Sequence, residues 1–144
     1  MHISRKLSVL LGMLSAAVVV AGCGGSPAVD LDMASMSDMP SEVRTAPITV
    51  QESYQFAVAN PEILEQIPCY CGCGAMGHTS NYSCYAEGTE ASGETIFDGH
   101  ALGCTICVDI TQDTMRLLTQ GKSITEIQAY VDQRYSQYGP PTTH

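Results

Sequence analysis

The sequence predicts a mainly α-helical protein, in which a small domain of three to four helices carries a long, irregular, cysteine-rich loop. Three observations support this fold class. Apolar residues recur at helical spacing in the segments 50–67, 102–120 and 124–135. Residues 68–103 are rich in Gly, Ser, Thr and Asn and follow no period. The first 22 residues have the pattern of an export leader and are therefore excluded from the fold.

The leader has the features of a bacterial lipoprotein signal peptide. Arg5 and Lys6 precede an apolar run over residues 7–20, and small residues stand directly before Cys23. This run is shorter than the ~20 residues that a membrane-spanning helix needs. We therefore expect cleavage before Cys23 and acylation of its thiol and new amino terminus, with palmitate among the acyl chains. Such a lipid anchor would hold the protein on the extracytoplasmic face of the cell membrane.

Residues 23–47 are predicted to form a flexible tether, because small and polar residues dominate and no period is visible. This segment contains Met33, Met36 and Met39 at three-residue intervals. Thioethers can bind Cu(I) and survive an oxidising envelope, so these methionines are candidate accessory copper ligands. The alternative is a low-complexity linker that merely tolerates methionine. The folded domain is then expected to span residues 48–144.

The amino-terminal part of the domain is predicted to contain two helices. Residues 50–59 are mostly good helix formers, and Asn60 and Pro61 then supply a cap and a first helical turn. The second helix is short, since Pro68 ends it immediately before the first cysteine of the domain.

The carboxy-terminal part is predicted to be a helical hairpin. A long helix over residues 102–120 is followed by Gly121, which suits a left-handed C-cap. Ser123 and Glu126 have the spacing of a capping box for a last helix that ends near Tyr135. The short connection between the two helices makes them antiparallel neighbours.

Composition restricts the class of function. Without its leader the chain keeps four strong cations against fifteen carboxylates. So acidic a surface repels nucleic acid, which favours a cation, a small molecule or a basic protein as partner. No carboxylate pair, nucleophile–base arrangement or phosphate loop is discernible, so we do not expect an enzyme. With two Phe and no Trp, the core is expected to need help from cross-links or a metal.

Cysteine carries the main functional signal. Single-residue spacing of Cys69, Cys71 and Cys73 brings their sulfurs close together, and the intervening glycines allow the loop to fold around an ion. Cys104 and Cys107 form a C-x-x-C pair at the start of the predicted long helix, where free amides and the helix dipole favour thiolates. The complete set of candidate metal ligands is Cys69, Cys71, Cys73, Cys84, Cys104, Cys107, His78 and His100.

Three chemistries compete for this set. Soft sulfur and imidazole donors favour Cu(I) or Zn(II). Six cysteines in an exported protein can instead pair as three disulfides. The Cys104–Cys107 pair can also serve thiol–disulfide exchange. Alternating cysteines bridge poorly, which favours a metal, whereas an oxidising compartment favours disulfides. A c-type haem is not expected, because Val108 stands where the axial histidine should follow.

The two histidines give a weaker signal. His78 and His100 each follow a glycine and lie near cysteines, which suits ligands presented by tight turns. The alternative for each is a polar loop histidine that bonds to a backbone carbonyl.

The segment Pro68-Cys69-Tyr70-Cys71-Gly72-Cys73, with the downstream histidines and the C-x-x-C pair, resembles the PCYCGC-motif lipoprotein family of bacterial envelopes. The resemblance covers residue 50 to the end. It implies an exported lipoprotein with a cysteine-rich, metal-binding domain, and it supplies no reaction.

The carboxy-terminal helices are also similar to those of cytochrome c maturation thiol-reductase subunits, in Met115-Arg116-Leu117-Leu118 and Gly121-Lys122-Ser123. This similarity implies a three-helix architecture and thiol–disulfide chemistry, although the additional cysteines depart from that pattern.

The sequence therefore predicts an envelope lipoprotein that binds copper or zinc through a Cys/His cluster, for capture, buffering or transfer. Its expected partners are the membrane, the metal ion and another envelope metal-handling or thiol protein. The alternatives are a thiol–disulfide exchange protein and a disulfide-stabilised interaction domain.

Overall fold

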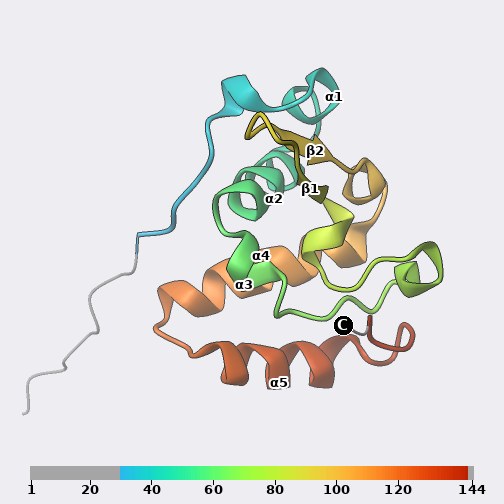
Figure 1. The fold of residues 1–144 in the computed structure, drawn as a ribbon. Helices are drawn as coiled ribbons and strands as arrows, with labels where there is room; N and C mark the ends of the chain where they lie inside the picture. Colours follow the sequence, from blue (N-terminus) through green and yellow to red (C-terminus); the bar gives the residue numbers. More distant parts are fainter. Residues whose placement is uncertain (1–29, 143–144) are drawn as a thin grey trace, which may run out of the picture.

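Three helices, α2 (Ile48–Ala59), α4 (Thr105–Thr119) and α5 (Ile124–Tyr135), carry most of the helical residues in the computed structural model. The structure describes residues 30–142 (Figure 1). Two single-turn helices, α1 (Ser41–Arg44) and α3 (Pro61–Leu64), flank α2. The strands are β1 (Ala86–Thr89) and β2 (Thr95–Phe97), and short 3-10 turns occupy Met36–Asp38, Cys73–Met76, Tyr82–Cys84 and His100–Leu102. The mainly α fold class is confirmed.

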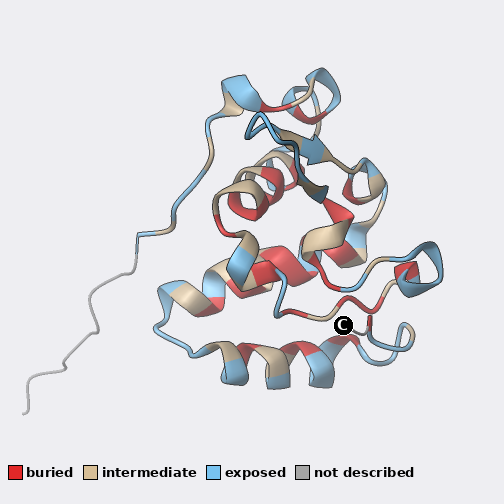
Figure 2. Ribbon diagram, viewed as in Figure 1, coloured by how far each residue is buried: buried red, intermediate tan, exposed pale blue. Residues whose placement is uncertain are grey.

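Helix α4 lies in the middle of the molecule, with α2 on one side and α5 on the other (Figure 1). Tyr54 and Phe56 of α2 are completely buried, as is Ile110 of α4. From α5, Ile127 and Val131 are also fully buried. Figure 2 marks the buried residues along the ribbons of α2, α4 and α5. In the part of the chain that the structure describes, no helix is long and apolar enough to cross a membrane.

The α4–α5 hairpin forms as the sequence predicts. Gly121 has φ +75°, a left-handed conformation that costs glycine no steric strain. The Lys122 amide donates to the Leu117 carbonyl over 3.1 Å, which satisfies a carbonyl at the end of α4. Both hydrogen bonds of the Ser123–Glu126 capping box are present at the start of α5.

The β-hairpin was not predicted from the sequence, which indicated no regular structure in this region. Strands β1 and β2 pair antiparallel, with an irregularity in register between Ala86 and Gly88. Gly93 turns the chain between them with φ +92°. The strands have only four and three residues, and Gly88 interrupts the apolar alternation of β1, so no period of two is visible.

Residues 32–47 pack against the domain, although the sequence predicts a flexible tether up to residue 47. The amide of Ala34 donates to the Gln55 carbonyl over 3.0 Å, and the Gln55 side chain donates to the Ala34 carbonyl over 2.7 Å. Met39 and Val43 are 3% and 1% exposed and belong to the core. This segment packs through isolated apolar residues between polar ones, and such residues show no helical period. The sequence pattern therefore did not indicate that the segment packs against the domain. The leader and Cys23 lie outside the described residues.

Candidate metal centre

Thiol groups from three separate segments converge on one point in the domain. Cys69, Cys71 and Cys73 come from the loop that leads into the turn Cys73–Met76, Cys84 ends the turn Tyr82–Cys84, and the last two cysteines begin α4. All six are free thiols. The closest sulfur–sulfur contacts are Cys69–Cys71 at 3.4 Å, Cys69–Cys107 and Cys71–Cys107 at 3.5 Å, Cys73–Cys84 at 3.7 Å and Cys104–Cys107 at 2.8 Å.

The loop that carries the first three cysteines is turned at Gly72 and held by the carboxy-terminal segment at Cys69. Gly72 has φ +85°, so the chain reverses between Cys71 and Cys73 in a conformation that L side chains rarely adopt. The amide of Cys69 donates to the Thr142 hydroxyl, and the Thr142 amide donates to the Cys69 carbonyl, each over 2.9 Å. The carboxy-terminal segment therefore fixes the first cysteine of the loop.

Helix α4 places the other two thiols. Cys104 is the N-cap residue, and its sulfur accepts a hydrogen bond from the Cys107 amide over 3.4 Å. This amide belongs to the first turn of the helix, where backbone donors have no partner within the helix. Cys107, one turn later, is completely buried, whereas Cys104 is partly exposed.

The donor atoms form two overlapping groups of four, each with all its atoms within 4.8 Å of one another. The first group consists of four sulfurs, and the second of three sulfurs and the His100 imidazole; the groups are Cys69, Cys71, Cys73 and Cys84, and Cys71, Cys84, His100 and Cys107. His100 Nε2 lies 3.4 Å from the Cys71 sulfur. For a tetrahedral ion with Zn–S bonds of about 2.3 Å, ligand atoms lie about 3.8 Å apart, which fits these groups.

Hydrogen bonds among the thiols divide them into acidic and weakly acidic groups. A hydrogen bond from the Cys107 thiol, with a smaller contribution from Cys84, holds the pKa of Cys69 far below its ordinary value. The Cys107 thiol also lowers the pKa of Cys104 to about 5, assisted by the Cys107 amide. Burial raises the pKa of Cys71 well above its ordinary value. A soft cation that binds the cluster displaces protons from the thiols that become its ligands.

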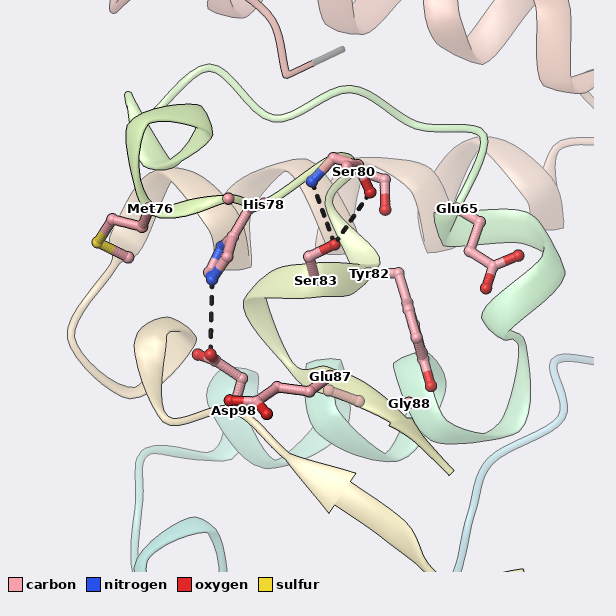
Figure 3. A pocket seen from close by; sticks show the side chains of 12 residues that line it. Glu65, Met76, His78, Ser80, Tyr82, Ser83, Glu87, Gly88 and Asp98 are labelled. Atoms are coloured by element: carbon pink, nitrogen blue, oxygen red, sulfur yellow. Dashed lines mark hydrogen bonds and ion pairs between the residues drawn. The ribbon is translucent and has the colours of Figure 1, made fainter. Parts of the chain in front are cut away.

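His78 and His100, both predicted ligands, occupy different positions. His100 belongs to the second donor group, whereas His78 lies outside both groups. The His78 ring packs edge-on against the His100 ring, with the ring centroids 5.2 Å apart. His78 Nε2 lies 3.5 Å from Asp98 Oδ2, and the two side chains face each other at the edge of a hollow of about 550 Å³ (Figure 3). The Asp98 carboxylate also accepts the His100 amide over 2.6 Å, so Asp98 joins the two histidine segments.

A buried polar network under the thiols was not predicted from the sequence. The hydroxyl of Tyr85 donates to the Cys107 carbonyl over 2.9 Å and lies 2.7 Å from the Thr111 hydroxyl. Asn81 donates to the same carbonyl over 3.2 Å and accepts from Thr111 over 2.6 Å. These residues lie far apart in sequence, and the only available signal was that polar residues flank Cys84 and follow Cys107 at helical spacing. The network holds the first turn of α4 against the turn that carries Cys84.

The accessory methionines lie in separate environments. Met39 is buried in the core, Met36 is partly buried and packs against the core, and Met33 is 38% exposed. They belong to the segment that packs along α2, and they are not part of either donor group. Their role as copper ligands stays a prediction.

The fold and the donor set together define a small, mainly helical, thiol-rich protein whose cluster has the geometry to hold a soft metal ion. The chain belongs to the family described as "Protein of unknown function with PCYCGC motif", which matches residues 13–144. No curated protein and no solved structure matches the chain significantly. The family membership confirms the resemblance to PCYCGC-motif proteins, whereas the lipoprotein character stays a prediction. The similarity to cytochrome c maturation subunits stays a prediction.

Proposed function

We propose that this protein captures, buffers or transfers a soft transition-metal ion, Cu(I) or Zn(II), at the cell envelope. The observation that carries the proposal is the convergence of five thiols and one imidazole into two groups whose donor atoms lie within 4.8 Å of one another. Thiolate and imidazole are preferred ligands of both ions. Anchoring through Cys23 belongs to the same proposal and rests on the leader sequence.

The burial pattern supports reversible loading. Cys69, Cys73 and Cys107 are at most 2% exposed, whereas Cys71 and Cys104 are partly exposed. An ion held by the buried sulfurs is protected from water, and the partly exposed sulfurs provide a path along which ligands can be exchanged. A transfer protein needs both properties.

The metal content of variants tests this function. The purified full-length protein, kept reduced and loaded with Zn(II) or Cu(I), is expected to retain stoichiometric metal through gel filtration. Replacing Cys69, Cys71 and Cys73 together by Ser should abolish retention, because these residues supply three donors of the first group. Ile96→Val is a suitable control, since this side chain is 39% exposed and carries no donor atom. Full metal retention by the triple variant would refute the proposal.

Thiol–disulfide exchange is a second candidate function, favoured by the Cys104–Cys107 pair. Its sulfurs lie 2.8 Å apart, and the pKa of the partly exposed Cys104 is lowered to about 5 by the Cys107 thiol. In this reaction the Cys104 thiolate attacks a partner disulfide and releases one partner thiolate. The Cys107 thiolate then attacks the mixed disulfide, so the pair becomes oxidised and the partner fully reduced.

Equilibration with glutathione separates the two candidates. An exchange pair should equilibrate at a potential well above that of inert structural disulfides. Cys107→Ser should trap the mixed disulfide that Cys104 forms, whereas Cys104→Ser should form none. Metal ligands should instead resist alkylation until a chelator removes the ion.

A further inference from the structure

We propose that the cluster binds two metal ions at once, bridged by the thiolates of Cys71 and Cys84. This inference rests on the proposed metal-binding function and adds a second ion to it. The two donor groups share these two residues and no others. Cys69 and Cys73 would then complete the shell of the first ion.

The identity of the shared donors supports bridging. A thiolate sulfur has several lone pairs and can bind two ions, whereas a neutral imidazole nitrogen has one and can bind only one. Both shared donors are sulfurs, and the imidazole of His100 lies in one group alone, beside Cys107. The overlap therefore falls on the donor type that can be shared.

The number of donors also favours two ions. One tetrahedral ion binds four ligands, so a single ion would leave two of the six grouped donors unused in a buried site. Two ions that share two ligands have four ligands each and use six donors in total. Every grouped residue then has a role.

Charge leads to the same result. Once two ions have displaced the thiol protons, the five grouped thiolates carry five negative charges, and burying unpaired charge is costly. Arg116 and Arg134 pair with Asp113, and Lys122 pairs with Glu126, so these cations are engaged elsewhere. Two divalent ions offset four of the five charges, whereas one offsets two.

Cadmium is a direct probe of this arrangement, because ¹¹³Cd(II) replaces Zn(II) and reports its ligands by NMR. The reduced full-length protein is expected to bind two equivalents of ¹¹³Cd(II). It should show two resonances, since one ion has four sulfur ligands and the other has three sulfurs and one nitrogen. The resonances should be split by ¹¹³Cd–¹¹³Cd coupling through the bridging thiolates.

Three variants assign the resonances. His100→Gln should shift one resonance and leave the ligands of the other unchanged. Cys71→Ser with Cys84→Ser should abolish the coupling. Ile96→Val is the control, because Ile96 is 39% exposed and its side chain carries no donor atom, and this variant should retain two coupled ions.

Other outcomes separate the two proposals. One equivalent with a single resonance would overturn the two-ion centre and leave the proposed function standing. Two equivalents without coupling would overturn the bridge. If the wild-type protein retains no cadmium, zinc or copper, the proposed function itself is wrong.

Discussion

Replacing Tyr85 by Phe tests whether the polar network under the thiols stabilises the domain before any metal binds. The side chain is completely buried, and its ring packs edge-on against Tyr54 with centroids 4.9 Å apart. The substitution keeps the ring and removes only the hydroxyl, which bonds to the Cys107 carbonyl and the Thr111 hydroxyl. It therefore separates the hydrogen bonding of the hydroxyl from the packing of the ring.

The expected loss follows from what the two partners keep. The Cys107 carbonyl still accepts from the Asn81 side chain over 3.2 Å, and the Thr111 hydroxyl still donates its proton to Asn81 over 2.6 Å. Since neither partner is left without a hydrogen bond, the cost is the net value of the hydrogen bonding of the Tyr85 hydroxyl and excludes the desolvation of a stranded group. We expect the free energy of unfolding to fall by about 1–2 kcal/mol.

Urea denaturation of the reduced, metal-free protein measures this loss, with equal m-values as the condition for comparing midpoints. Tyr138→Phe is the matched control, because Tyr138 is 57% exposed and its loss of a hydroxyl should change little. A loss for Tyr85→Phe that equals the control would show that the network does not stabilise the fold. A decrease in the free energy of unfolding above about 4 kcal/mol would show that the substitution leaves a buried polar group without a hydrogen-bond partner.

Three further predictions concern the last helix and the anchor. Ser123→Ala should cost about 1 kcal/mol in chemical denaturation by removing the cap acceptor, with metal content unchanged; a loss of metal with normal stability would contradict a purely structural role. The Glu126 carboxylate bonds to Lys122 and Ser123, which lowers its pKa from 4.5 to about 2. The contribution of this carboxylate to stability should be complete above pH 4.5 and disappear as the pH falls towards 2. The difference in free energy of unfolding between wild type and Glu126→Gln should therefore shrink as the pH falls from 4.5 towards 2. Cys23→Ser should abolish palmitate labelling, and unchanged labelling would refute the lipid anchor.

Local signals explain which parts of the fold could be predicted. Gly121 and the Ser123–Glu126 capping box are read within a few residues of sequence, and both occur in the structure. The β-hairpin was missed because its strands are short and Gly88 interrupts one of them. Met39 was assigned to a tether because burial of a single apolar residue against a distant helix leaves no periodic pattern.

The site was predictable in composition and only partly in geometry. Spacing alone showed that Cys69, Cys71 and Cys73 must be close together, since one residue separates each pair. The sequence could not show that His100 rather than His78 joins the thiols, because both follow a glycine and only the folded chain distinguishes them. The contact of Thr142 with Cys69 joins segments 73 residues apart, so it too depends on the tertiary fold.

Native mass spectrometry combined with alkylation tests the central claim most directly. The full-length protein, purified without oxidation or added chelator, is predicted to carry a soft metal ion while the thiols of the cluster resist alkylation. Removal of the ion by a chelator should then expose the five grouped thiols to the reagent. A protein that carries no metal and whose thiols alkylate at once, or that contains three disulfides, would contradict the account.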